Sequence, residues 1–222
     1  MYTSVVRLQN VFGFFTTVAF VVAAFIAASD FVAERAPIVR TLKTTSVQVV
    51  RGRPHYYSSK KEEYAVINFS LDADLSSLFT WNTKQVFVYV TAEWPAADHS
   101  TTNATNEAVI WDSIITSPSA DHLANHWSRR HEEAAQERGR EDGKLVLKNQ
   151  RHKYKITHPS GKLATTENVT LRLHYNVQPW VGLLTWNQDV DYGYWKALKN
   201  GVSKRFKLPA IKEKKPASAG SR

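Results

Sequence analysis

Hydrophobic positions follow two different patterns along the chain, and the first is a continuous run near the N-terminus. Residues 11–28, VFGFFTTVAFVVAAFIAA, carry no charge. As a helix rising about 1.5 Å per residue, this run would span roughly 27 Å, close to the thickness of a membrane's hydrocarbon core. It has no polar stripe, which disfavours a helix buried in a soluble domain. The pattern predicts a transmembrane signal anchor over residues 11–29.

The charges that flank this run predict its orientation. Arg7 and the α-amino group precede it, whereas Asp30 and Glu34 follow it. Because positive flanks stay on the cytoplasmic side, residues 1–10 should be cytoplasmic and the C-terminal body should lie in the lumen. A cleaved signal peptide is the alternative, with Ala27-Ala28-Ser29 as the small residues at the cleavage site. The run exceeds the usual apolar region of a signal peptide, which favours an uncleaved, single-pass type II anchor.

From residue 40 onwards, the second pattern is the alternation of apolar and polar residues that is typical of β-strands. Clusters of Asn, Asp, Gly, Pro and Ser separate these segments, and no long amphipathic helix follows. The pattern predicts an all-β domain over residues 30–212, antiparallel and sandwich-like. The expected strands are 44–51, 64–71, 84–93, 108–115, 144–148, 151–157, 169–175 and 204–208.

The segment FTWNTKQVFVYVTAEW, residues 79–94, is apolar on both faces of its predicted strand. Val86, Val88 and Val90 fall on one face, and Phe87 and Tyr89 fall on the other. We expect the valines to fill the core. The two aromatic residues should lie beneath either a protein partner or another part of this chain, and the pattern leaves both alternatives open.

Composition and charge narrow the range of partners. The chain has 222 residues and a formal net charge of +9, and eight of these nine charges belong to the region from Lys196 to the end. The rest of the chain is nearly neutral. The C-terminal region from Lys196, which ends in a predicted basic tail over residues 213–222, therefore carries the basic charge. Charge placed there rather than in a folded patch argues against nucleic acid as a partner. The chain has no cysteine, so it has neither a disulfide nor a thiolate metal site.

Three glycosylation motifs lie on the predicted lumenal side, at Asn68, Asn103 and Asn168. Asn68 lies inside an alternating run, where its backbone should be tied into a sheet, and we discount it. Asn103 lies in a polar loop and Asn168 begins a strand after a loop, so both should be accessible. The sequence predicts glycosylation at Asn168 and Asn103.

Residues 117–143 form a polar, charged insertion that contains a group of histidines. His122 and His126 have helical i, i+4 spacing and could share a metal, with His131 five residues further on. No HExxH motif surrounds them, so a solvated surface helix with incidental histidines is the favoured interpretation. The sequence therefore predicts no metal site.

Asp72 and Asp74 resemble the short acidic pair with which many glycosyltransferases hold a metal and a sugar nucleotide. Those enzymes need alternating strands and helices, which this chain lacks, so a turn is preferred. The chain also has no GxSxG nucleophile elbow. We predict no catalytic residue and no cofactor. A type II lumenal enzyme, either a glycosyltransferase or a hydrolase, remains the alternative function.

Four stretches, in this order, resemble the signal peptidase complex subunit 3 family, the accessory subunits of the eukaryotic enzyme that removes signal sequences. They are RLQNVFGFFTTVAF, FSLDADLSSLFTWNTKQVFVYVTAEW, AVIWDSII and NVTLRLHYNVQPWVGLL. The resemblance extends from residue 5 to about residue 190. Residues 117–143 look like an insertion relative to the family, and the basic tail is longer. The form of NVQPWVGLL points to a fungal source.

The resemblance implies a type II protein of the endoplasmic reticulum membrane that takes part in signal peptide processing. It implies that the catalytic serine, histidine and aspartate belong to a separate subunit, which this chain supports from the lumenal side. The partners would be that catalytic signal peptidase subunit and the other subunits of the complex. Asn168 matches a glycosylation position of the family. Phe87 and Tyr89 are the candidate partner-facing residues, and Trp180 takes their place if this chain covers both of them itself.

Overall fold

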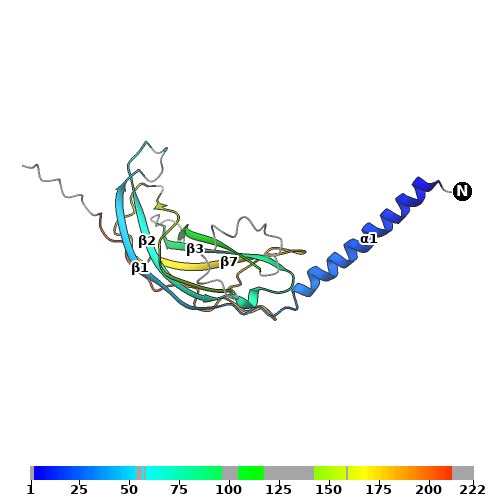
Figure 1. Cartoon of the computed structure of the whole chain (residues 1–222). Helices are drawn as coiled ribbons and strands as arrows, with labels where there is room; N and C mark the ends of the chain where they lie inside the picture. The colour runs from blue at the N-terminus through cyan, green and yellow to red at the C-terminus, as the bar shows by residue number, and fades with distance from the viewer. Residues whose placement is uncertain are drawn as a thin grey trace, which may run out of the picture.

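The computed structural model describes residues 3–53, 57, 59–96, 105–117, 143–158 and 160–211. Figure 1 shows one long helix extending away from a β-rich body. The predicted tail 213–222, and all but the two ends of the predicted insertion 117–143, lie outside the described residues. The elements in chain order are α1 (Ser4–Asp30), β1 (Ile38–Gly52), β2 (Glu62–Asp74), η1 (Ser76–Leu78), β3 (Thr83–Pro95), β4 (Thr105–Thr116), β5 (Lys144–Gln150), β6 (Ile156–Thr157), β7 (Thr170–Pro179) and β8 (Thr185–Trp186).

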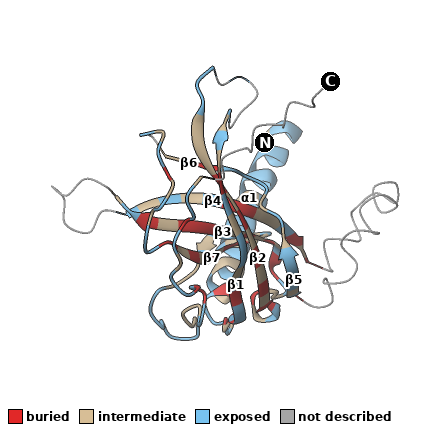
Figure 2. Cartoon of the chain, turned by 90° about the vertical axis from the view of Figure 1, so that its left-hand side faces the viewer, coloured by how far each residue is buried: buried red, intermediate tan, exposed pale blue. Residues whose placement is uncertain are grey.

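Helix α1 contains the apolar run and begins earlier than the predicted span. It is long and apolar enough to cross a membrane, by length and composition, and Figure 2 shows it almost entirely exposed. The hydroxyls of Thr16 and Thr17 donate to the carbonyl oxygen of Gly13, at 2.8 and 2.9 Å. Such internal hydrogen bonds lower the cost of placing a hydroxyl in lipid. The predicted apolar N-terminal helix is confirmed.

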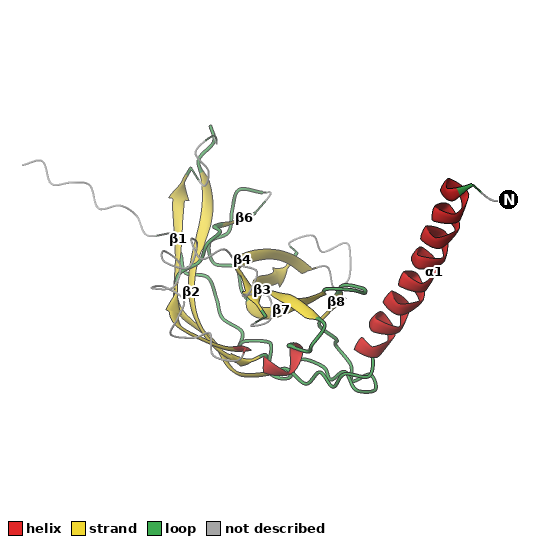
Figure 3. Cartoon of the chain, turned by 45° about the vertical axis from the view of Figure 1, so that its right-hand side comes forward, coloured by secondary structure: helices red, strands yellow, loops and turns green. Residues whose placement is uncertain are grey.

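The remaining elements form two antiparallel sheets. The first has the order β1-β2-β5, with β6 also paired to β2, and the second has the order β4-β3-β7-β8. Figure 3 shows the first sheet lying over the second, with α1 leaving from one end of the body. The prediction of an antiparallel, sandwich-like domain is confirmed.

The core lies between the two sheets and is filled by the apolar side chains that alternate with outward-facing ones along the strands. Val86, Val88 and Val90 of β3 are fully buried, as the sequence predicts. The buried residues of β2 include Phe69, whose ring meets that of Trp111 on β4 edge-on, with 5.9 Å between centroids. Because these strands belong to different sheets, this aromatic pair links the two layers.

The predicted strand 151–157 is shorter in the structure, where only β6 is a strand. The N–H groups of Lys153 and Tyr154 both donate to the carbonyl oxygen of Ile110, at 2.8 and 3.1 Å. Ile110 lies at a bulge in β4, where the pairing with β3 skips one residue between Val90 and Thr91. The bulge leaves the Ile110 carbonyl outside the ladder, so a loop binds there in place of a strand.

The predicted strand 204–208 is wrong, although this segment does run along β7. Val169 and Phe206 exchange two backbone hydrogen bonds, at 3.0 and 2.9 Å. Further along, the N–H of Leu171 donates to the side-chain oxygen of Ser203 at 2.9 Å. A hydroxyl therefore takes the place of a backbone carbonyl, which interrupts the ladder and leaves only isolated bridges.

Arg35 joins the end of α1 to the sandwich. Its guanidinium donates to the carboxylate of Asp30 at 2.6 Å and to the hydroxyl of Thr185 at 2.7 Å. It also lies 4.7 Å from the ring centroid of Trp195, which stacks on Phe31 with 5.3 Å between centroids. Arg35 is buried, with 3% of its surface exposed. One side chain thus ties the last turn of the helix to β8 and to the C-terminal segment.

Glu63 closes the opposite end of the sandwich. Its carboxylate accepts the backbone N–H groups of Leu163 and Ala164, at 2.7 and 2.9 Å. These hydrogen bonds favour the ionised form and hold the pKa of Glu63 below its ordinary value. The loop that precedes Asn168 is fastened to β2 in this way.

We predict that Glu63→Gln lowers the free energy of unfolding by about 1 kcal/mol at neutral pH, because a charged acceptor is lost at a partly exposed site. The pKa of Glu63 is lower in the folded state, so its stabilisation is present above the unfolded pKa and is lost as the pH falls through the folded pKa. Urea unfolding of the full chain in detergent between neutral and acidic pH measures this, with Glu62→Gln as the control. If Glu63→Gln loses as much unfolding free energy between neutral and acidic pH as the unsubstituted chain does, the assignment is contradicted.

Candidate functional site

The outward face of the second sheet carries a stack of three rings. Phe87 and Tyr89 alternate with the buried valines of β3 and point away from the core. Their rings stack with 5.4 Å between centroids, and Tyr89 stacks on His174 of β7 at 4.9 Å with an interplanar angle of 10°. His174 lies directly opposite Tyr89 in the ladder, so the register of β3 and β7 creates the stack.

Exposed apolar side chains extend this stack across the sheet. Ile114 of β4 lies opposite Phe87, and on the other side Trp186 of β8 lies opposite Asn176, the partner of Phe87 on β7. Ile114 and Trp186 are each about half exposed, at 50% and 53%. We call Phe87, Tyr89, His174, Ile114 and Trp186 the aromatic face. Phe87, Tyr89 and His174 are partly exposed, so the five residues together present apolar and aromatic area on one side of the sheet.

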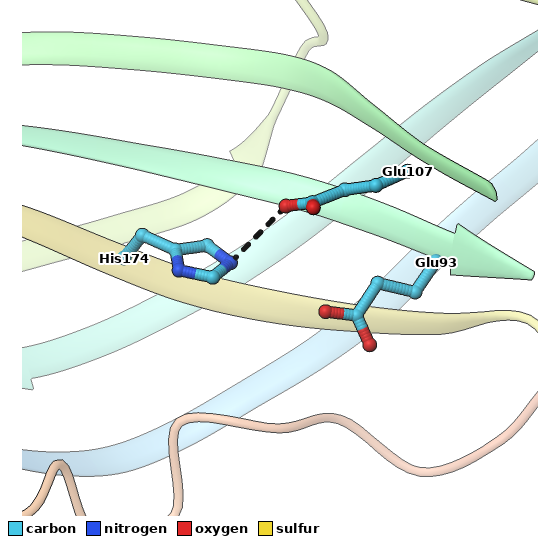
Figure 4. A group of neighbouring side chains, drawn as sticks. All are labelled: Glu93, Glu107 and His174. Atoms are coloured by element: carbon cyan, nitrogen blue, oxygen red, sulfur yellow. Dashed lines mark ion pairs between the residues drawn. The ribbon is translucent and has the colours of Figure 1, made fainter. Parts of the chain in front are cut away.

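A network of ion pairs borders the aromatic face, and Figure 4 shows one of them, between His174 and Glu107, with Glu93 nearby. The carboxylate of Glu93 on β3 lies 2.9 Å from Arg172 Nε, and that of Glu107 on β4 lies 3.5 Å from His174 Nε2. The Thr91 hydroxyl lies 3.0 Å from the same ring nitrogen. Ligand atoms of Glu93, Glu107 and His174 lie within 4.8 Å of one another, a spacing that could hold a cation. Arg172 already supplies a positive charge to Glu93, so we interpret the group as an ion-pair network.

The electrostatics of this region keep Tyr89 neutral. Burial raises the pKa of the Tyr89 phenol, and the nearby carboxylate of Glu107 raises it further. A neutral phenol can both donate and accept a hydrogen bond without placing a charge at the centre of the aromatic face. The charged side chains lie at one border of that face. The face therefore offers an apolar centre with a charged rim, the usual layout of a protein interface.

The predicted partner-facing residues fall into two places. Phe87 and Tyr89 come together in the aromatic face, but Trp180 lies beyond the end of β7, in the connection to β8. The ammonium of Lys84 lies 5.3 Å from the Trp180 ring centroid, and the Trp180 N–H donates to the carbonyl oxygen of Asn82 at 2.8 Å. Trp180 thus belongs to a different surface from the other two.

Of the acidic pair of β2, Asp74 has structural contacts. Leu71 and Ala73 are buried, so Asp72 and Asp74 point outward from the first sheet. Asp74 accepts the hydroxyl of Ser76 at 2.6 Å and its N–H at 3.2 Å, and these hydrogen bonds lower the pKa of Asp74. This is the turn that the sequence predicts at the end of the strand.

One serine hydroxyl of the described residues meets a histidine ring within hydrogen-bond distance. Ser160 Oγ lies 2.6 Å from His158 Nδ1, and the backbone N–H of Ser160 donates to the same nitrogen at 3.1 Å. Asn106 approaches the other ring nitrogen at 3.5 Å. The two residues are neighbours in one turn, and the ring nitrogen caps a backbone N–H. A general base needs this nitrogen free to activate the hydroxyl, so we do not interpret the pair as catalytic.

The glycosylation candidates differ in what the structure describes. Asn168 is exposed, with a left-handed backbone conformation at φ 57°, immediately before Val169 pairs with Phe206. Asn68 pairs with Ser46 inside β2, as the sequence predicts. Asn103 lies outside the described residues, and so do the candidate metal ligands His122, His126 and His131.

Sequence reasoning missed the ion-pair network and the contacts of Arg35 and Asn82. Alternation alone places Arg172 and His174 on the outward face of their strand. Their acidic partners come from β3 and β4, and the register that aligns the three strands has no local signal in the sequence.

Comparison with known proteins gives a consistent result. A family model described as "Signal peptidase subunit" matches residues 1–132 and 136–195, so the match breaks within the predicted insertion. A Saccharomyces cerevisiae protein is 33% identical over 203 residues, covering 86% of this chain and 93% of the relative. A Debaryomyces hansenii protein is 31% identical over 206 residues, covering 88% and 94%. A Homo sapiens protein is 32% identical over 125 residues, covering 56% and 55%. Each relative is named signal peptidase complex subunit 3.

Proposed function

The chain belongs to the signal peptidase subunit family, and from this membership we propose that it is a noncatalytic accessory subunit of the endoplasmic reticulum signal peptidase complex. In this role it supports a separate catalytic subunit in removing signal sequences from nascent secretory proteins. Other subunits of the complex are its partners, and α1 holds it in the membrane.

The contacts of Thr91, Ser160 and Asp74 support the noncatalytic role. Thr91, which meets His174, is fully buried and out of reach of a peptide substrate. Ser160 meets His158 only within a turn, and Asp74 ends a strand. Nucleophilic catalysis needs an accessible nucleophile beside a base that a third group orients, and none of these three places provides that arrangement.

The aromatic face is the surface that we propose for the catalytic subunit. It combines three partly exposed stacked rings and the half-exposed Trp186 with a rim of ion pairs on the rigid centre of the second sheet. Aromatic residues contribute more binding energy per residue than most others when a partner covers them. We place the body in the lumen, with residues 1–10 in the cytoplasm, because Arg7 precedes the apolar run and acids follow it.

We predict that the purified chain does not cleave a signal-sequence substrate, whereas a preparation that also contains the catalytic subunit does. Asp72→Asn with Asp74→Asn should leave cleavage by the assembled complex within a few fold, because Asp74 holds a turn and Asp72 only points outward from the first sheet. A complex whose catalytic subunit lacks its nucleophile is the control. Cleavage by this chain alone, or a loss of several orders of magnitude in an assembled Asp72→Asn/Asp74→Asn complex, would overturn the accessory role.

A second prediction concerns the aromatic face. Phe87→Ser combined with Tyr89→Ser should reduce recovery of the catalytic subunit in co-purification by about tenfold or more, because apolar contact area is lost at the centre of the interface. The thermal unfolding temperature of the chain itself should change little. Val146→Ser, which removes an exposed apolar side chain from the first sheet, is the matched control. If the chain unfolds while its remaining folded fraction still assembles, this chain covers the two rings itself.

The third prediction concerns topology and glycosylation, which we propose at Asn168 and Asn103. Asn168→Gln should increase the gel mobility of protein made in endoplasmic reticulum membranes, because Asn168 is exposed beside a loop. Asn68→Gln should leave mobility unchanged, since Asn68 is held in β2. The body should resist protease in sealed microsomes until detergent is added. Unchanged mobility of Asn168→Gln, or digestion without detergent, would contradict the proposed placement.

A further inference from the structure

Four large apolar side chains gather at one corner of the second sheet. Trp81 precedes β3, and Trp180, Leu183 and Leu184 belong to the connection between β7 and β8. Their exposed fractions are 68%, 44%, 72% and 58%. We call these four residues the Trp–Leu tip. Exposing this much apolar area at one place is costly in water unless another surface covers it.

The tip rests on a buried asparagine. Asn82 is 2% exposed, its side-chain amide donates to the carbonyl oxygen of Val181 at 2.7 Å, and its amide oxygen accepts the N–H of Val181 at 3.2 Å. The backbone carbonyl of Asn82 accepts the N–H of Trp180 at 2.8 Å. Three hydrogen bonds from one residue therefore hold the connection against the start of β3. The exposed side chains project from a fixed backbone.

The tip lies beside the membrane-spanning helix. A Cβ built on Gly182 would lie 3.5 Å from the Cβ of Ala27, and Gly182 has a φ of 132°, which favours glycine. Ala27 is three residues before the end of α1, about 4.5 Å along the axis at 1.5 Å per residue. Figure 3 shows the connection next to β8 approaching the lower end of α1. The tip is thus level with the last turn of the apolar segment.

The geometry points to a second membrane contact: the Trp–Leu tip inserts into the lipid interface of the bilayer that α1 crosses. This inference rests on the proposed membrane anchorage of α1. We choose lipid as the binding partner of the tip because the tip adjoins the last turn of α1, which lipid would surround. Leu183 and Leu184 suit the acyl boundary, and Trp81 and Trp180 suit the headgroup level, where tryptophan is enriched. Lys84, whose ammonium lies over the Trp180 ring, is placed to meet lipid phosphates.

The absence of cysteine from the sequence allows a direct test with single-cysteine variants of the full chain. Leu183→Cys reports on the tip, and Val18→Cys reports on the middle of α1. Val202→Cys is the matched control, since Val202 is an exposed apolar residue that pairs with Arg172, far along β7 from the tip. Each variant carries a polarity-sensitive fluorophore and is reconstituted into phosphatidylcholine vesicles. Nitroxide groups on the lipid acyl chains quench from within the bilayer, and iodide quenches from water.

We expect the label at residue 183 to show blue-shifted emission, quenching by nitroxides placed high on the acyl chain, and protection from iodide. The label at residue 202 should show the reverse, and the label at residue 18 should respond to nitroxides placed deeper. Quenching by iodide at residue 183, with residue 18 still protected, overturns the inference and leaves the anchorage intact. Should the catalytic subunit then protect residue 183, the tip binds protein rather than lipid. Iodide quenching at residue 18 would instead refute the anchorage.

Discussion

The arrangement of this protein depends on the buried ion pair between Arg35 and Asp30. The two side chains meet at 2.6 Å, and the guanidinium also reaches Thr185 and lies over Trp195. Breaking a buried pair by removing one partner costs about 3–5 kcal/mol, because a charge is left uncompensated. The backbone of Arg35 adds two hydrogen bonds to the C-terminal segment, through Tyr194 and Lys196. A helix that would otherwise turn freely about its linker therefore has a fixed direction relative to both sheets.

Given this fixed direction, the second sheet presents two chemically different surfaces. Its outward face has stacked rings at the centre and ion pairs at the border, around Tyr89 and His174. Its corner next to α1 carries exposed tryptophan and leucine side chains, with the ammonium of Lys84 over the Trp180 ring. The rigid core beneath, where Val86 and Val88 are fully buried, keeps the two surfaces at a constant separation. A subunit built in this way can hold a partner at a set height above the membrane.

Much of the architecture follows from the sequence, because alternation and apolar length are local signals. The buried positions of β3 and the outward positions of Phe87 and Tyr89 are predicted from a period of two. The strand predicted over 204–208 does not form because the N–H of Leu171 donates to the hydroxyl of Ser203 instead of to a backbone carbonyl. This contact depends on where Leu171 lies in the fold, which the local sequence does not show. The contacts of Arg35 with Trp195, and of Asn82 with Val181, join residues about a hundred or more positions apart. Nothing in the local sequence identifies such partners.

The C-terminal segment that runs along β7 also determines how this protein can associate with other chains. Leu173, Leu171 and Val169 satisfy their outer backbone groups with Gly201, Ser203 and Phe206, and β8 pairs with Asn176 and Val177. An unpaired strand edge is a template on which another chain can extend a sheet, and this route underlies much edge-to-edge aggregation. At β7 the template is already occupied by the protein's own chain. A chain truncated before residue 201 would expose this edge of β7. The C-terminal segment therefore prevents another chain from extending the sheet there.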